Sequence, residues 1–307
     1  MMHYRSLEEV SLNNSWLAVG VFDGVHRGHQ KIIKRLVGGA HENGVTAVLL
    51  TFDPHPAKVF GRGDIKLLTL PGERARLLGN FGVDVVITHP FDTELANVTA
   101  FDFMKRLKTQ LGLDHLILGY DSALGKNREG NPARLTEIGS ELGYGVEVVS
   151  ALSDESGVIS STEIRKLVAV GKMREASALL GHPYSLQGLV AIGDQRGRTI
   201  GFPTANLDYA LEKVVPASGI YACWAYLGSE KHKAAVNIGT NPTFTPDKQT
   251  LNVEAYLLDF DREIYGEAVR LEFAARLRDE LRYDSVDALV KQIEQDVEQT
   301  RDLLGTE

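Results

Sequence analysis

Residues Gly20-Val21-Phe22-Asp23-Gly24-Val25-His26-Arg27-Gly28-His29 form the most informative segment of the chain. They follow the apolar run Trp16 to Val19 and precede the helical pattern of Gln30 to Leu36. This order predicts a buried strand, a glycine-rich turn and a helix that begins near His26. Glycines let the backbone approach a ligand closely, and the free N–H groups of a helix start attract anions. The segment therefore predicts a phosphate site.

His26 and His29 are three residues apart, so they share one face at the start of the expected helix. Two imidazoles beside free backbone N–H groups suit the stabilisation of charge on phosphorus during nucleotidyl transfer. A metal pair would need a third ligand, which the neighbouring sequence does not supply, and two surface histidines are the other structural alternative. The spacing fits neither a Walker loop nor a dinucleotide fingerprint. The strand, glycines and helix together favour phosphate binding.

The pattern Gly-x-Phe-Asp-Gly-x-His-x-Gly-His resembles the signature of the bacterial bifunctional riboflavin kinase/FMN adenylyltransferase (FAD synthetase) family, in its nucleotidyltransferase half. The resemblance implies that His26 and His29 are catalytic and that the turn binds ATP phosphates. The turn residues implied as ATP ligands are Gly20, Phe22, Asp23, Gly24 and Gly28.

Length and composition indicate a globular protein of two domains. The 307 residues allow about two cores, and 43% hydrophobic with 24% charged residues is ordinary for a soluble chain. No apolar run nears the roughly 18 residues of a membrane span, and the first residues lack a signal-peptide core. A single cysteine, Cys223, excludes an internal disulfide and fits a cytoplasmic location.

The net charge of −8 is concentrated in the second half of the chain. Up to His182 there are 20 Lys and Arg against 21 Asp and Glu, and after it there are 13 against 20. Nucleic-acid surfaces need clustered Lys and Arg. We therefore expect small-molecule substrates, with no nucleic acid, no membrane and no obligatory protein partner.

Short apolar runs alternate with helical patterns from Trp16 to about Leu180. This alternation predicts a Rossmann-like, doubly wound α/β domain whose ligands bind at the carboxyl ends of parallel strands. The expected strands are 17–21, 45–52, 83–88, 115–119 and 146–149, and the expected helices are 30–37, 73–81, 100–111, 135–142 and 173–180. Gly181 and Pro183 end the last helix, which predicts domains at 1–182 and 183–307.

The segment Thr51-Phe52-Asp53-Pro54-His55-Pro56 follows the second expected strand. Its prolines fix a rigid turn that places His55 at the ligand-binding edge of the sheet, although by chemistry alone a stiff loop without function is equally favoured. The family carries a similar segment, which implies that Phe52, Pro54, His55 and Pro56 shape the flavin site.

The segment Gly119 to Gly130 follows the fourth expected strand. Asp121 and Gly125 match the family pattern Gly-x-Asp/Asn-Phe-x-Phe-Gly, which implies flavin binding. Ser122 and Leu124 replace its two phenylalanines, so flat-ring packing must come from elsewhere.

Two basic segments are candidates for phosphate contacts. Lys126 and Arg128 either meet phosphates or form a solvated loop. In residues 159–165 a serine caps a helix and Arg165 follows one turn later; a cap with an exposed arginine is the structural alternative. The string resembles the family motif Ile-Ser-Ser-Thr-x-Ile-Arg, which implies ATP contacts by Ser160, Ser161, Thr162 and Arg165.

Short, turn-bounded runs after Tyr184 predict a small antiparallel β-barrel. The expected strands are 184–192, 221–227, 232–238, 252–257 and 268–273. Residues 285–304 predict an amphipathic helix that packs on the barrel, with Ser285 as its cap. Its expected apolar face is Val286, Leu289, Ile293 and Val297.

Gly201-Phe202-Pro203-Thr204-Ala205-Asn206 places two oxygen-bearing side chains on one side of an extended segment. Thr204 and Asn206 offer the hard oxygens that Mg²⁺ accepts, and a turn with a local Asn hydrogen bond is the structural alternative. The string resembles the Gly-x-Pro-Thr-Ala-Asn signature of riboflavin kinases. That resemblance implies metal binding by Thr204 and Asn206 and ATP binding by Gly201 and Pro203.

Further segments match the kinase pattern in order: 219–222, 237–244, 253–260 and 273–282. The resemblance implies that Asn241 contacts the flavin and that Glu254 is the general base for the primary hydroxyl of riboflavin. Composition says only that Glu254 is a charged residue inside a strand. An outward-facing carboxylate is the structural alternative.

The motifs span nearly the whole chain, so the sequence predicts a bifunctional enzyme. The barrel would phosphorylate riboflavin to FMN with MgATP, and the α/β domain would transfer AMP from ATP to FMN, giving FAD and pyrophosphate. One rival is a kinase whose first half only binds flavin nucleotides, motivated by Ser122 and Leu124. A second is a tRNA-linked enzyme with a similar His-x-Gly-His turn, which the acidic balance opposes. A third variant would use another nucleotide or flavin analogue.

Overall fold

The computed structural model describes residues 1–61, 65–155, 157–193, 195–240 and 251–305. Contacts divide the chain into two compact units, Met1–Ser161 and Thr162–Glu307. The first is the expected doubly wound α/β fold, and the second contains the expected antiparallel barrel with a terminal helix.

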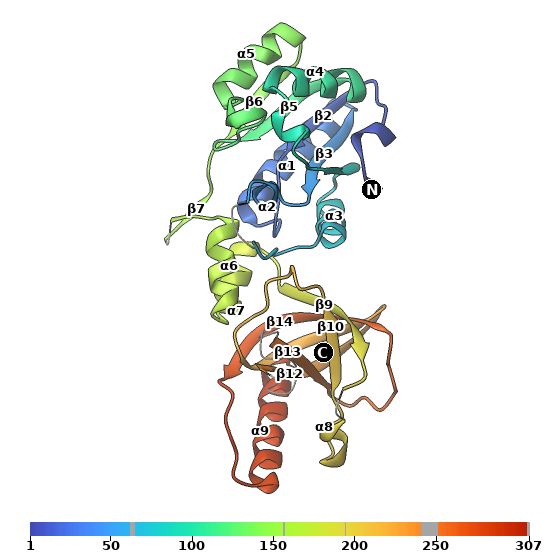
Figure 1. Ribbon diagram of the computed structural model, residues 1–307, viewed down its shortest axis with the longest axis vertical. Helices are drawn as coiled ribbons and strands as arrows, with labels where there is room; N and C mark the ends of the chain where they lie inside the picture. The colour runs from blue at the N-terminus through green and yellow to red at the C-terminus, as the bar shows by residue number, and fades with distance from the viewer. Residues whose placement is uncertain (62–64, 156, 194, 241–250, 306–307) are drawn as a thin grey trace. The chain divides into compact units, whose positions relative to one another are not determined.

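The first unit is built on a six-stranded parallel sheet (Figure 1). Its strands, in the spatial order β1-β4-β3-β2-β5-β6, are β1 Met2–Tyr4, β4 Val85–Pro90, β3 Thr46–Asp53, β2 Ser15–Val19, β5 Leu113–Gly119 and β6 Gly145–Val149. The chain runs from β2 through β3 to β4 on one side and places β5 and β6 on the other. The order therefore reverses between β2 and β5, where open α/β sheets bind ligands. The short edge strand β1 was not expected.

Helices cover both faces of this sheet. They are α1 Arg27–Glu42, α2 Pro56–Val59, α3 Pro71–Asn80, α4 Ala100–Leu111 and α5 Pro132–Leu142. Side chains alternate along β2, so Trp16 and Ala18 pack with α1 and α3, while Leu17 and Val19 pack with α4 and α5. Burial on both faces explains why the strands read as continuous apolar runs.

Shorter elements complete the first unit. They are the 3₁₀ turns η1 Leu7–Glu9, η2 Leu95–Asn97 and η3 Lys126–Arg128, and the two-stranded pair β7 Ser153–Asp154 and β8 Gly157–Val158.

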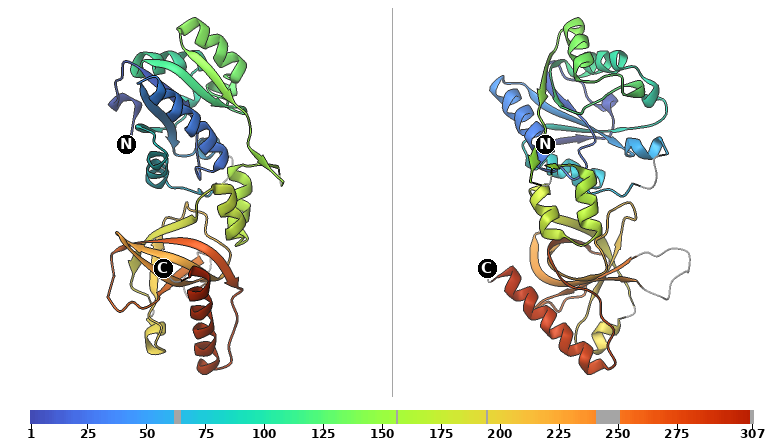
Figure 2. Two further views of the ribbon diagram at one scale, coloured as in Figure 1. Left: turned by 180° about the vertical axis from the view of Figure 1, so that it is seen from behind. Right: turned by 90° about the vertical axis from the view of Figure 1, so that its left-hand side faces the viewer.

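The second unit contains a closed barrel in the strand order β10-β13-β12-β11-β14-β9 (Figure 2). The strands are β9 Tyr184–Ala191, β10 Ala205–Tyr209, β11 Gly219–Leu227, β12 Glu230–Thr240, β13 Leu251–Leu257 and β14 Ala268–Arg278. β10 was not among the expected strands. The buried side chains of Tyr221 and Phe273 contact each other edge to face, with ring centroids 5.4 Å apart.

Two helices precede the barrel strands, α6 Ser161–Ala169 and α7 Met173–Leu180. α7 packs against β9 and β14, and the turn at Gly171 (φ 76°) lies against Tyr221 and Arg276. These contacts explain why α7 and the turn before it group with the barrel, although the sequence places the change of domain at His182. The short helix α8 Arg196–Thr199 follows β9.

Helix α9, Val286–Leu304, packs on β11, β12 and β14, and Ser285 caps it as expected. The expected apolar face was wrong at Val286, which is 60% exposed. The other three predicted residues, Leu289, Ile293 and Val297, are half-buried, and the fully buried residues of α9 are Asp296 and Thr300. Arg278 of β14 binds Asp296 through Nε and Nη2, at 2.8 and 2.6 Å. This ion pair fixes the rotation of α9 on the barrel.

Candidate active sites

The turn after β2 has an unusual backbone. Phe22 (φ 52°), Gly24 (81°) and Val25 (43°) all take left-handed conformations. For a β-branched residue such as Val25 this conformation is costly, and both Phe22 and Val25 are buried. Burial of these side chains holds the turn, which delivers the chain to α1 at His26.

The Asp23 side chain holds the turn in place by hydrogen bonds to residues 68 and 69. Its buried carboxylate accepts hydrogen bonds from the backbone N–H groups of Leu68 (3.0 Å) and Thr69 (2.9 Å) and from the Thr69 hydroxyl (3.1 Å). The Gly24 N–H donates to Thr69 Oγ1, and the Ser161 hydroxyl donates to the Asp23 carbonyl oxygen, both at 2.9 Å. A structural role for Asp23 is therefore visible, and its ATP contact stays a prediction.

His26 caps α1, and its ring lies against that of His29. The His29 backbone N–H donates to His26 Nδ1 at 3.4 Å. Because Nδ1 accepts, a neutral His26 carries its proton on Nε2. The two rings stack with centroids 3.6 Å apart and planes 20° apart, and Phe22 meets His29 edge-on at 5.1 Å. Gly28 keeps this cap close, because a Cβ there would lie 3.1 Å from the His26 ring.

Burial lowers the pKa of His29 well below 6.5, with further lowering by His26 and Arg74. The imidazole is therefore neutral at physiological pH, and its buried Nδ1 has no hydrogen-bond partner among the described residues. Sequence reasoning missed Arg74, which is 1% exposed and donates from Nη2 to the Phe52 carbonyl oxygen at 2.9 Å. An arginine between apolar positions of the expected helix 73–81 was the available signal.

A pocket of about 780 Å³ opens at the carboxyl ends of β2, β3, β4 and β5. It brings together many of the residues expected to bind ATP or flavin. The predicted site residues that line this pocket are Gly20, Phe22, His29, Phe52, His55, Pro56, Asp121 and Gly125. His26, Gly28 and Pro54 are outside this lining, with His26 stacked behind His29. His55 caps α2 by accepting from the Ala57 N–H at 3.1 Å, so its position is fixed by the helix.

An aromatic wall of this pocket comes from Phe52, which the sequence predicted at the flavin site, and from Phe60 and Phe91, which sequence reasoning did not select. Phe91 contacts Phe52 and Phe60 edge to face, at 5.3 and 5.9 Å, and all three line the pocket. Flat-ring surface is thus present in the pocket lining, although Ser122 and Leu124 replace the two phenylalanines of the family pattern. Both Ser122 and Leu124 line the pocket, and Leu124 also belongs to the buried core. The position of Phe91 directly after a strand end was the signal that could have found it.

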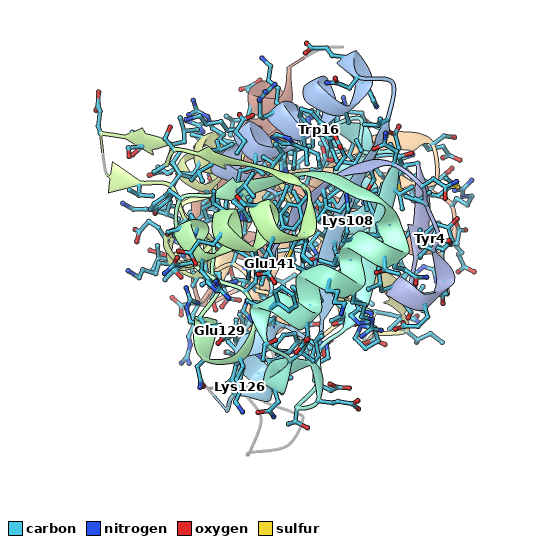
Figure 3. The ribbon with its side chains drawn as sticks, turned by 90° about the horizontal axis from the view of Figure 1, so that it is seen from above. Tyr4, Trp16, Lys108, Lys126, Glu129 and Glu141 are labelled. Atoms are coloured by element: carbon cyan, nitrogen blue, oxygen red, sulfur yellow. The ribbon has the colours of Figure 1, made fainter. Side chains whose placement is uncertain are left out.

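The basic loop after β5 also lines the pocket, through Lys126 and Arg128. Gly125 (φ 72°) lets this loop pass the start of α4, because a Cβ there would lie 2.4 Å from the Ala100 nitrogen. The Ala100 N–H donates to the Glu129 carboxylate at 2.7 Å. Lys126 and Glu129 are marked in Figure 3. The loop is therefore tied to α4 on one side and faces the pocket on the other.

The Ile-Ser-Ser-Thr segment lies where the two units meet in sequence. Ser160 immediately precedes α6, and Ser161 is its first residue. Thr162 and Arg165 belong to the second unit. Apart from the Ser161 bond to the turn, the ATP contacts of this segment stay predictions.

A second polar constellation lies on the outer face of the barrel. Asn206 of β10 pairs directly with Glu254 of β13, and Val253 and Ala255 point inward, fully buried. Thr204 Oγ1 lies 3.4 Å from Glu254 Oε2. Asn252, which the sequence reasoning missed, donates from Nδ2 to Glu254 Oε1 at 2.6 Å and to Asn206 Oδ1 at 3.4 Å. Its position two residues before Glu254 puts it on the same strand face.

The oxygens of this constellation fit a hard cation. Thr204 Oγ1 and Asn206 Oδ1 are neutral oxygen donors beside a carboxylate, the donor type that Mg²⁺ accepts next to nucleotide phosphates. Gly193 leaves room for the Asn206 side chain, because a Cβ at this glycine would lie 2.2 Å from Asn206 Nδ2. In the described part of the chain, no group of three or more His, Cys, Asp or Glu side chains could hold a metal ion. The metal-pair alternative for His26 and His29 therefore finds no third ligand of these types there.

A small pocket of about 120 Å³ adjoins Thr204. Pro203, Arg198 and Phe260 are among its lining residues. Gly201 (φ 89°) turns the chain before Pro203, in a conformation that favours glycine. Asn241, expected at the flavin, lies outside the described residues.

Two family models match the chain. The model described as FAD synthetase matches residues 8–163, and the model described as riboflavin kinase matches residues 180–304. Among the helices that the structure describes, none is both long and apolar enough to cross a membrane.

Curated relatives are similar over nearly the whole chain. A bifunctional riboflavin kinase/FMN adenylyltransferase of Listeria monocytogenes is 38% identical, covering 97% of this chain and 95% of its own. The protein of the same description from Escherichia coli K12 is 35% identical, covering 98% and 96%. A crystal structure described as a macrolide-efflux protein from Streptococcus pneumoniae is 32% identical, covers 98% of both chains and has a TM-score of 0.89.

Proposed function

The chain belongs to the bifunctional riboflavin kinase/FMN adenylyltransferase family, and from that premise we propose which of its residues perform each reaction. The enzyme phosphorylates riboflavin to FMN with ATP and then adenylylates FMN with a second ATP, giving FAD and pyrophosphate. We assign the adenylyl transfer to residues 1–182 and the kinase reaction to residues 183–307.

For adenylyl transfer, the reacting groups bind in the pocket at the carboxyl edge of the sheet. A phosphate oxygen of FMN attacks the α-phosphorus of ATP, and pyrophosphate leaves. The His26 Nε2–H and the neutral His29 imidazole stabilise the charge that builds on the transferring phosphate, and Arg165 steadies the leaving group. The stacked pair, fixed at a helix start beside the pocket, is the observation that carries this assignment.

The flavin lies against the aromatic wall of the same pocket. Phe52, His55, Pro56, Asp121 and Gly125 keep their expected roles there, because all of them line it. Stacking on flat apolar surfaces favours a ring system of this size. Lys126 and Arg128 add positive charge near the phosphates.

For the kinase reaction, Glu254 is the general base. Its carboxylate takes the proton of the primary ribityl hydroxyl while that oxygen attacks the γ-phosphorus of ATP and ADP leaves. Thr204 and Asn206 would hold Mg²⁺, with Gly201 and Pro203 shaping the ATP site. A bound Mg²⁺ would supply positive charge next to the nucleotide phosphates. The proximity of Thr204 and Asn206 to Glu254 supports a metal site beside the general base.

We also propose the binding partners and the cellular location of the enzyme. Small molecules suffice as partners, without nucleic acid, membrane or an obligatory protein. A cytoplasmic location is supported by the single, buried, unpaired Cys223.

One experiment separates the two assignments. Purified enzyme is incubated with riboflavin, ATP and Mg²⁺, and riboflavin, FMN and FAD are separated over time by chromatography. The double variant His26→Ala with His29→Ala should accumulate FMN without FAD, and Glu254→Gln should form FAD only from added FMN. Loss of both activities in either variant would contradict the division of roles.

A further inference from the structure

The side-chain amide of Asn252 connects the two functional parts of the kinase site. Its Nδ2 donates to Glu254 Oε1 at 2.6 Å and to Asn206 Oδ1 at 3.4 Å. The first bond is short and involves a carboxylate, which makes it the stronger kind of hydrogen bond. One amide group thus contacts both the assigned base and an assigned metal ligand.

The acceptors determine which way this amide faces. Both neighbouring atoms, Glu254 Oε1 and Asn206 Oδ1, are oxygens. Only the nitrogen end of Asn252 can donate to them, and the opposite orientation would set its own oxygen against a carboxylate. The same bond directs Asn206 Oδ1 rather than its nitrogen toward the site.

The bond also fixes the direction of the Glu254 carboxylate. With Oε1 held by Asn252, Oε2 faces Thr204, whose Oγ1 lies 3.4 Å away. A general base must lie within hydrogen-bond distance of the proton that it removes. A carboxylate that is held in one rotamer stays in that position, so less conformational entropy is lost when the reaction occurs.

We propose that Asn252 is a positioning residue of the kinase reaction, which holds Glu254 and Asn206 in their working orientations through its amide N–H. This inference rests on the assignment of Glu254 as the base. Asn252 acts through Glu254 and Asn206, and touches no reacting atom.

Three substitutions distinguish donation from mere space filling. Asn252→Asp keeps the shape but replaces the donor by an acceptor, Asn252→Ser keeps a smaller donor, and Asn252→Ala removes the group. Riboflavin phosphorylation should rank wild type, Ser, Ala, Asp in falling kcat, with Asp reduced at least tenfold and the KM for riboflavin and ATP within about threefold. A space-filling residue would rank the variants by size, in the order Asp, Ser, Ala, with Asp nearest to wild type, and that order would overturn the proposal. So would an effect confined to KM.

Asn237→Ala is the matched control. Asn237 pairs with Glu254 from β12, on the side away from β10, and its Oδ1 has no hydrogen-bond partner among the described residues. Its kcat should stay within about threefold of wild type; a loss equal to that of Asn252→Ala would mean that any amide lost beside Glu254 is harmful, and would overturn the specific role. Adenylylation of added FMN and the melting temperature confirm that each variant is folded.

A double-mutant cycle separates this proposal from the base assignment. If Glu254→Gln and Asn252→Asp each lower kcat, and the double variant is no slower than the residual rate of Glu254→Gln, both stand. If Glu254→Gln is inactive but Asn252→Asp retains full kcat, only the role of Asn252 fails. If Glu254→Gln keeps wild-type kcat, the base assignment fails and the role of Asn252 falls with it.

Discussion

Asn206 and Glu254 face each other across the β10–β13 ladder, so that a side-chain amide and a carboxylate lie side by side on the outside of the barrel. The strands come from segments almost fifty residues apart, and the pairing gives the site its geometry. The backbone of Gly193 approaches the same amide closely enough to exclude any side chain of its own.

We expect Gly193→Ala to lower riboflavin phosphorylation at least tenfold and to leave adenylylation of FMN unchanged. The new Cβ would lie 2.2 Å from Asn206 Nδ2, so the amide must rotate out of its working position. Both rates are measured with the same preparation. Gly72→Ala, where a Cβ meets nothing within 4 Å, should change neither rate. An unaltered kinase rate in Gly193→Ala would contradict the role of Asn206.

We expect His29→Gln to slow FAD formation from FMN by about a hundredfold, the usual cost of losing one preorganised group that stabilises transition-state charge. The ring stacks on His26 and borders the pocket, so the substitution removes it from both. Riboflavin phosphorylation serves as the internal control and should be unaffected. If the rate of FAD formation falls less than threefold, His29 only packs against its neighbours and its catalytic role is contradicted.

The stability of the α/β unit should decrease as the pH falls below about 6.5. Burial lowers the pKa of His29, so the folded state excludes a proton that the unfolded state takes up. The contribution is present above the unfolded value of 6.5 and is lost as the pH falls toward the lower folded value. Trp16 fluorescence in a Trp224→Phe background reports unfolding of this unit. The free energy of unfolding should depend less on pH between 6.5 and 5 in the His29→Gln variant than in the protein that retains His29. Equal slopes in the two proteins would refute the contribution of His29.

We expect Asp296→Ala to destabilise the barrel by about 3 kcal/mol or more, because it leaves the largely buried Arg278 without its partner. Asp259→Ala is a matched comparison, since Arg301 binds Asp259 through two nitrogens in the same way but at an exposed position. Exposed pairs contribute little. Denaturant unfolding followed by Trp224 fluorescence measures both, and equal effects would show that burial does not decide the outcome.

Much of the α/β fold could be predicted because its signals are local. His26 caps α1 as the turn sequence indicated, and the alternation of apolar runs with helical patterns gave the parallel sheet. β10 was harder, because it is only five residues long and begins two residues after Pro203, in a segment whose glycine and proline also indicate a turn. Such a short pattern becomes a strand only through its neighbours β9 and β13.

The missed site residues share a different cause. Arg74, Asn252 and Phe91 gain their roles from partners distant in sequence, namely the Phe52 carbonyl, the Asn206 amide and the Phe52 ring. On α9, Asp296 is buried beside the partly buried Ile293 and Val297 because it pairs with Arg278, a contact that the apolar pattern does not reveal. Periodicity measures average hydrophobicity and does not anticipate one specific buried pair.

The closed barrel limits which sequence changes the enzyme can accept during evolution. In an open sheet an outer strand can slide by two residues and keep its buried face, but in a ring each strand is bonded on both sides. A shift of β13 against β10 would have to be matched by its pairing with β12. Insertions are therefore tolerated only in the connecting loops, while side chains such as Asn252 can be exchanged one at a time. The alignment of base and metal ligands is thereby inherited with the barrel itself.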